Sequence, residues 1–72
     1  MTFMNYIEKL ETIKYLSLLK RTGTVEKLAE KLNVSERTTR RMVQQLREHG
    51  FPISYNRLRY TYEVKNAPEK TK

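Results

Sequence analysis

The segment 28–41 reads LAEKLNVSERTTRR and decides the fold, because it ends one helix and begins another within three residues. Upstream of the turn, apolar residues recur at the helical spacing i, i+3, i+4 and i+7: Val25, Leu28, Ala29 and Leu32. Asn33 readily adopts the left-handed conformation that ends a helix, and Ser35 is a favoured N-cap for the next one. Two helices joined by so short a turn must cross at a large angle.

The helix after the turn is predicted over residues 36–49, with Gly50 as its terminator. At 100° per residue its core face holds Thr39, Val43 and Leu46, with Met42 at the margin. The face turned away from the core holds Arg37, Arg41, Gln44 and Glu48, with Arg40 on the flank. A helix stabilised by its own ion pairs would intersperse the two signs of charge, whereas the N-terminal half of this helix is basic.

Two further helices are predicted upstream. Thr24 is the expected N-cap of the helix that ends at Asn33, with Glu26 in its first turn. A first helix is predicted over residues 6–21, which contain neither Gly nor Pro. Its main apolar face holds Tyr6, Leu10, Ile13 and Leu16, and four apolar residues fall outside that arc: Ile7, Tyr15, Leu18 and Leu19. Either the remainder of the domain covers these four side chains, or they form a partner surface such as a homodimer contact.

After Gly50 the period of the apolar residues changes from the helical value to two, which indicates a β-hairpin over residues 53–64. The alternating residues are Ile53 and Tyr55 on the first strand, and Tyr60, Tyr62 and Val64 on the second. The connection between the strands places the guanidinium groups of Arg57 and Arg59 at the exposed tip. The predicted fold class is therefore mainly α with a β-hairpin, a three-helix bundle with a two-stranded wing. We expect residues 1–65 to form this domain and the polar residues 66–72 to be a disordered tail.

Two stretches resemble bacterial winged helix-turn-helix DNA-binding domains. Segment 28–41 is similar to the helix-turn-helix core of deoxyribose-operon-type repressors and of the amino-terminal domains of WYL regulators, and segment 50–57, GFPISYNR, is similar to the wing entrance of the second group. The sequence departs from that pattern with Thr39 in place of Val or Ile, Met42 in place of an acid, and Thr61 in place of Gly. We expect the Thr39 hydroxyl to bond to a backbone carbonyl one turn back. The resemblance implies a winged helix-turn-helix with double-stranded DNA as its partner.

The charge of the chain points to the same class of partner. Fifteen Lys and Arg residues against eight acids leave a net charge of +7 at pH 7. Residues 37–59 contain six arginines and no lysine, and Glu48 is their single acid. A basic domain of this size usually binds a polyanion, and a guanidinium suits phosphates and guanine edges better than an ammonium does. A solvated basic face that maintains solubility is the alternative interpretation.

We expect the third helix to enter the major groove of DNA with its N-terminal turns against base edges. The candidates for base contact are Glu36, Arg37, Arg40, Arg41 and Gln44, with Arg40 and Arg37 as first choices. The candidates for contact with the DNA backbone are Thr24, Ser35, Thr38 and Arg47, of which Ser35 and Thr24 also have helix capping as a structural role. The wing would reach the neighbouring minor groove or backbone through Asn56, Arg57 and Arg59.

The composition argues against several other classes of function. The chain has no Cys and one His, so no metal, cofactor or disulfide is expected. The sequence has no catalytic pair or Gly-rich phosphate loop, so an enzyme is not expected. It also has no apolar run of the roughly 18 residues that span a membrane and no signal-peptide pattern, so we expect a cytoplasmic, nucleoid-associated protein with no membrane or small-molecule ligand. Two alternatives stay open: a winged-helix module that binds another protein, and a small architectural DNA-binding factor of a phage or mobile element.

Overall fold

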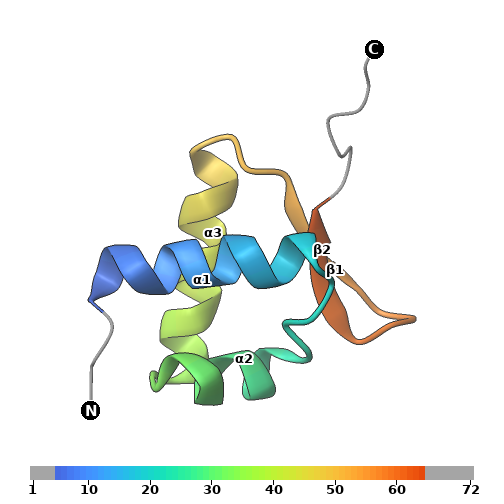
Figure 1. The fold of residues 1–72 in the computed structure, drawn as a ribbon, viewed down its shortest axis with the longest axis horizontal. Helices are drawn as coiled ribbons and strands as arrows, with labels where there is room; N and C mark the ends of the chain where they lie inside the picture. The colour runs from blue at the N-terminus through green and yellow to red at the C-terminus, as the bar shows by residue number, and fades with distance from the viewer. Residues whose placement is uncertain (1–4, 65–72) are drawn as a thin grey trace.

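The computed structural model describes residues 5–64 and has a mainly helical architecture with one antiparallel two-stranded sheet. In chain order the elements are α1 (Tyr6–Leu18), α2 (Val25–Leu32), α3 (Glu36–Glu48), β1 (Ile53–Asn56) and β2 (Thr61–Val64) (Figure 1). This is the layout of a winged helix-turn-helix, as the sequence predicted. The predicted tail over residues 66–72 lies outside the described residues. None of the helices within residues 5–64 is long and apolar enough to cross a membrane.

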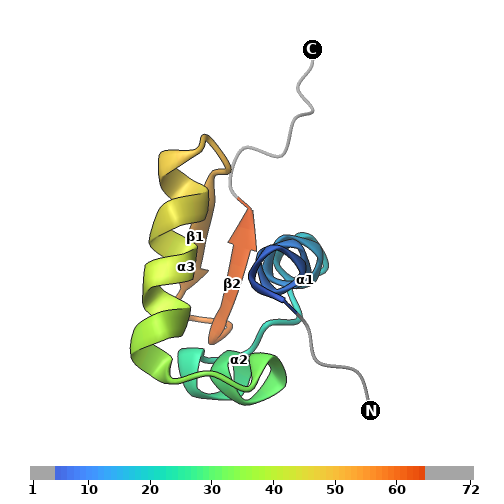
Figure 2. The ribbon, with the colours of Figure 1, turned by 90° about the vertical axis from the view of Figure 1, so that its left-hand side faces the viewer.

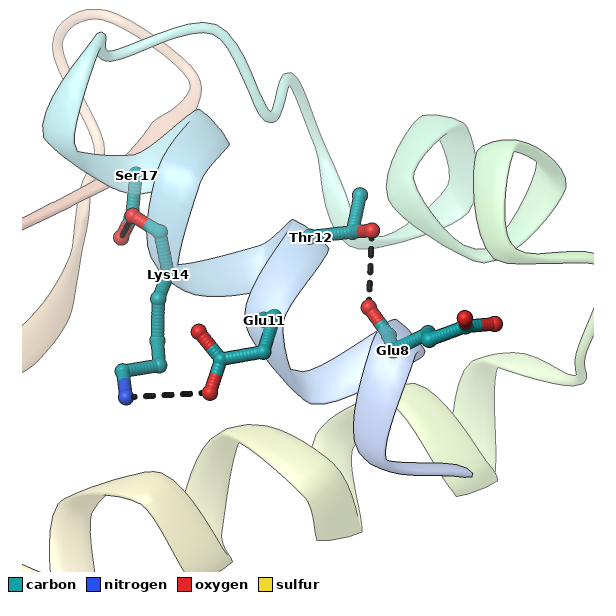
Figure 3. A network of polar contacts seen from close by, with 5 residues as sticks. All are labelled: Glu8, Glu11, Thr12, Lys14 and Ser17. Atoms are coloured by element: carbon teal, nitrogen blue, oxygen red, sulfur yellow. Dashed lines mark hydrogen bonds and ion pairs between the residues drawn. The ribbon is translucent and has the colours of Figure 1, made fainter. Parts of the chain in front are cut away.

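Local polar contacts stabilise α1 from its first turn onward. Asn5 and Glu8 form a capping box, in which the Asn5 side chain accepts from the Glu8 N–H at 2.8 Å and Glu8 Oε1 accepts from the Asn5 N–H at 3.0 Å. Figure 3 shows the Thr12 hydroxyl donating to the Glu8 carbonyl at 2.9 Å, and Lys14 Nζ pairing with Glu11 Oε2 at 3.5 Å. These contacts lie within the helix itself and do not depend on the core.

The end of α1 differs from the prediction. The helix stops at Leu18, so the expectation that it continues to residue 21 was wrong. Lys20 adopts a left-handed backbone with φ of 58°, and the Arg21 N–H donates to the Leu16 carbonyl at 2.8 Å, which closes the last turn. Because neither Gly nor Pro marks this end, residue type carried no signal for it.

The second apolar face of α1 is not covered by the rest of the domain. The four apolar side chains outside the main apolar arc are all exposed: Ile7, Tyr15, Leu18 and Leu19. The least exposed of them is Leu19, at 48%. The interpretation that the remainder of the fold covers these four side chains was therefore wrong, and a partner surface on α1 stays a prediction. Tyr6, expected on the core face, is exposed as well, and its hydroxyl donates to Gln45 Oε1 on α3. Two short helices and a two-stranded hairpin are too small to wrap both faces of α1.

The turn between α2 and α3 agrees with the sequence-based prediction. Thr24 and Ser35 each cap a helix with a side-chain oxygen that accepts a backbone N–H of the first turn, at 3.3 and 3.1 Å respectively. Asn33 ends α2 in the left-handed region with φ of 59°. The Thr39 hydroxyl donates to the Ser35 carbonyl at 3.0 Å, which confirms the backbone bond expected for this buried polar side chain.

The hydrophobic core lies where the three helices meet the hairpin. Its buried residues come from α1, α2, α3 and both strands: Ile13, Leu28, Leu32, Met42, Val43, Leu46, Ile53 and Tyr62. Met42, expected at the margin of the core face, is fully buried. Figure 2 shows α1 and α3 on opposite sides of the domain, and the two helices also contact each other directly. The side of α3 that faces away from α1 is therefore covered by no other element of residues 5–64.

The hairpin pairs Tyr55 with Tyr62 and Asn56 with Thr61, in antiparallel register. β2 contacts α1, and β1 contacts α3. The second strand begins at Thr61, so the prediction that Tyr60 alternates with Tyr62 on this strand was wrong. Tyr60 has φ of 55° and belongs to the turn, because a residue in the left-handed region cannot continue a β-strand.

Two buried threonines join the hairpin to the loop between α1 and α2. The Thr22 and Thr61 hydroxyl oxygens lie 3.0 Å apart. Thr61 Oγ1 also accepts from the Gly23 N–H at 3.1 Å, and Thr22 Oγ1 accepts from the Tyr62 N–H at 2.7 Å. Thr61 stands where the wing of the resembled family commonly has Gly, so this sequence places a buried hydrogen-bonding side chain at a position where Gly has none. The pair holds the base of the wing against the helical part of the domain.

Replacing Thr61 by Val should lower the free energy of unfolding by about 2 kcal/mol. The change conserves shape but leaves the part-buried Gly23 N–H without its acceptor and removes one of the partners of the buried Thr22 hydroxyl, and an unsatisfied buried polar group costs about 1–3 kcal/mol. Chemical denaturation followed by circular dichroism measures the difference. The matched control is Thr12→Val on α1, which we expect to stay within about 0.5 kcal/mol of the wild type. Equal effects of the two substitutions would contradict a structural role for the threonine pair.

Candidate nucleic-acid interface

The residues of α3 opposite the core form one exposed polar surface, which we call the outward stripe: Arg37, Arg41, Gln44 and Glu48. Thr39 and Val43 are buried on the inner face of α3, so the residues of the outward stripe, which lie on the opposite face of the helix, point into solvent. Within residues 5–64, neither Arg37 nor Arg41 forms an ion pair. Near the C-terminal end of the stripe, Gln44 Nε2 donates to Glu48 Oε2 at 3.3 Å.

A second group of α3 residues, which we call the wing-side flank, lies beside the hairpin: Glu36, Arg40 and Arg47. Arg40 Nη2 lies 3.6 Å from Glu36 Oε1, and these side chains are 61% and 43% exposed. Arg47 donates through Nε to the Ile53 carbonyl at 3.0 Å and through Nη1 to Gln44 Oε1 at 3.3 Å. The Arg47 guanidinium thus links the C-terminal half of α3 to the start of β1. Contact of Arg47 with the DNA backbone stays a prediction.

Arg40 lines an open hollow of about 460 Å³ between α3 and the wing, together with Glu36, Tyr55 and Tyr62. The rings of Tyr55 and Tyr62 meet edge to face with centroids 5.0 Å apart. Burial raises the pKa of Tyr62 above its ordinary value of 10.0, while the positive charge of Arg40 acts in the opposite direction. The two tyrosines therefore pack against each other and against the core. Arg40 contributes a positive charge to the hollow between α3 and the wing.

The candidates for backbone contact at the helix starts have structural partners in this chain. Ser35 and Thr24 cap their helices, as described above, and the Ser35 hydroxyl also lies 3.1 Å from Thr38 Oγ1. Thr38 is half-buried in the first turn of α3. Since capping leaves the first backbone N–H groups of a helix directed outward, a phosphate at the start of α3 is compatible with it.

At the tip of the wing, Arg57 and Arg59 are both exposed, as expected. Asn56 is half-buried, and its side-chain oxygen accepts from the Leu58 N–H at 2.9 Å and the Arg59 N–H at 3.2 Å. Asn56 therefore shapes the turn that presents the two guanidinium groups, and its own contact with DNA stays a prediction.

Helices α1 and α3 lie on different sides of the domain (Figure 2), and the exposed Tyr6 side chain of α1 reaches α3, where it lines a hollow with Arg41, Gln44 and Glu48. Sequence reasoning found the stripe and the tip because helix periodicity and turn composition are local signals. It missed the Thr22–Thr61 pair and the bond from Tyr6 to Gln45, which join residues far apart in the chain. Within residues 5–64, no group of three or more His, Cys, Asp or Glu side chains is arranged to hold a metal ion.

Comparison with known proteins gives one result. A protein-family model described as an HTH domain matches residues 9–59, which is more than half of the chain and runs from within α1 through α2, α3 and β1 into the turn of the hairpin. No curated protein and no solved structure matches the sequence.

Proposed function

The chain belongs to the HTH domain family, and on that premise we propose that it is a sequence-specific double-stranded DNA-binding protein that regulates transcription. In this proposal α3 enters the major groove, and the wing lies on the adjacent minor groove or backbone. Its place of action is the nucleoid, in the cytoplasm, and it performs no catalysis. A small architectural DNA-binding factor of a phage or mobile element is the nearest alternative.

The observation that carries the proposal is the exposed outward stripe beside a basic wing. Arg37 and Arg41 stand at the N-terminal half of α3 with no ion pair among the described residues, and this is the half that reads base edges in helix-turn-helix proteins. Arg57 and Arg59 add two exposed cations at the tip of the wing. We assign base contacts to the first pair together with Glu36, Arg40 and Gln44, and backbone or minor-groove contacts to the second.

The ion pair between Arg40 and Glu36 does not remove Arg40 from this set. An exposed pair at i and i+4 contributes about 0.3–0.5 kcal/mol, whereas a well-placed guanidinium on a guanine edge contributes about 1–3 kcal/mol to discrimination. Arg40 therefore gains by leaving Glu36 for DNA. Glu36, released, can accept a hydrogen bond from cytosine or orient a neighbouring arginine.

A second role is favoured by the exposed apolar side chains of α1, which we assign to contact with a second copy of the chain. In this proposal a two-fold contact would use the exposed side chains of Ile7, Tyr15, Leu18 and Leu19 on α1 and would not use the outward stripe of α3. Two copies would then meet half-sites about one helical turn apart. A different protein partner on the same face is the alternative.

Binding to a fluorescent random-sequence duplex should weaken steeply with salt. If about 5–7 phosphates are neutralised, the slope of log affinity against log salt concentration is about −4 to −6. Fluorescence anisotropy at several salt concentrations measures this slope. A flat response would remove the proposal that the basic surface binds a duplex.

Arg40→Ala and Arg57→Ala should affect different properties of the complex. Loss of Arg40 should cost about 1–3 kcal/mol on a preferred sequence and reduce the preference itself, while loss of Arg57 should weaken all sequences alike. Competition between preferred and random duplexes separates the two effects. Lys9→Ala removes a cation from α1, so it serves as the control and should change neither the affinity for DNA nor the sequence preference. If both arginine variants lose affinity equally on all DNA, Arg40 contacts phosphate and the architectural alternative gains support.

Leu18→Glu should shift the chain from dimer to monomer, because it introduces a charge into the apolar surface of α1. Light scattering at low salt, with and without duplex, measures the oligomeric state. Lys27→Glu, an exposed change on α2 that also adds an acid, should leave it unaltered. A wild-type chain that is monomeric in both conditions would rule out the second copy as occupant of this face.

A further inference from the structure

The tip of the wing combines two exposed apolar side chains with two cations. Leu58 is 91% exposed, more than any other large apolar residue among the described ones, and Tyr60 is 66% exposed. They alternate along the turn with Arg57 and Arg59, which are also exposed. Figure 1 shows this turn at the end of the hairpin that extends away from the helices. The function argued above uses the arginines and leaves Leu58 and Tyr60 without a role.

The turn has a defined shape that holds these side chains outward. Asn56 accepts from the backbone N–H groups of Leu58 and Arg59 through its side chain, and from the Tyr60 N–H through its carbonyl at 2.8 Å. The Asn56 amide in turn donates to Glu63 Oε2 at 3.1 Å, which anchors the turn to the second strand. Leu58 therefore lies at the apex of a hydrogen-bonded turn. Because the backbone of this turn is already ordered, binding costs little further backbone entropy.

Tyr60 occupies a backbone conformation that its residue type disfavours. Its φ of 55° is in the left-handed region, where Gly or Asn is the usual residue at the end of such a turn. With two thirds of the side chain exposed, packing against the domain does not compensate for the strain. A strained aromatic residue that contributes little to the core is better explained by a contact made outside the domain.

We propose that Leu58 is a wedge that enters the minor groove and partly unstacks one base step, with Tyr60 beside it against the groove wall. The inference rests on the proposed function. An apolar side chain between two guanidinium groups fits a duplex, because the groove places a stack of bases between two rows of phosphates. Arg57 and Arg59 hold the phosphates on either side, and Leu58 meets the bases.

The wedge would add to sequence preference at a position that α3 does not touch. Inserted apolar side chains open the minor groove and bend DNA by about 20–90° toward the major groove, so insertion of Leu58 should kink the duplex at the step beneath the wing. Pyrimidine–purine steps unstack most easily and should be preferred beneath the wing. Leu58 would thus act as a specificity-determining residue through deformability of the DNA.

The experiment uses the full chain and the tightest-binding duplex recovered from a random library. Dyes at the two ends report bending by energy transfer, and 2-aminopurine, placed in turn at each step, reports unstacking as an increase in fluorescence. Wild type should raise both signals, with the 2-aminopurine response confined to one step of the wing half. Leu58→Ala should abolish both and weaken binding about tenfold, while Leu58→Met, which keeps a long apolar side chain, should retain them.

A second variant separates the contact from the fold. Tyr60→Gly removes the strain of the left-handed residue, so its melting temperature should equal or exceed that of wild type, while its affinity for the duplex should fall. If Leu58→Ala binds and bends DNA as wild type does, the wedge is wrong and duplex binding stands. If wild type binds no duplex, both the wedge and the proposed function fail.

Discussion

One-sided burial of α3 is the constraint on which the rest of the molecule depends. Met42 and Leu46 lie in the core with residues of α1, α2 and both strands, since so small a domain has few large apolar residues with which to build one. Once this face is fixed, the 3.6-residue period directs Arg37, Arg41 and Gln44 to the opposite side. The same packing that stabilises the fold thus presents the polar face of the helix to a partner.

Two polar ties then decide where the wing stands relative to that face. The Thr22–Thr61 pair attaches the base of the hairpin to the loop after α1, and Arg47 attaches the start of β1 to the end of α3. The threonine pair is buried and the bond from Arg47 is partly buried, so each shields a polar contact from water to a different degree. They set the wing beside α3, with Arg40 in the hollow between the two. The exposed arginines of α3 and of the wing tip can then act together on one polyanion.

The sequence predicted the local features well, because their causes are local. A cap is a side chain bonded to the backbone three residues on, and a left-handed Asn33 or Gly50 ends a helix by its own conformational preference, so these were found from residue type alone. The end of α1 and the start of β2 were predicted wrongly, because no residue type marks either position. α1 ends through a left-handed Lys20, and β2 begins late because Tyr60 takes a turn conformation that its residue type disfavours.

The sequence by itself determined three helices, a sharp turn between two of them, a hairpin, and the gathering of arginines on α3 and the wing. Periodicity, capping and charge are properties of neighbouring residues, and they need no knowledge of the rest of the chain. Only the tertiary structure decided that α1 leaves its second apolar face uncovered, that Tyr6 bonds to Gln45, and that Thr61 bonds to Thr22. The choice of contact partners depends on how much surface the small domain can cover and on which distant groups its packing brings within hydrogen-bonding distance.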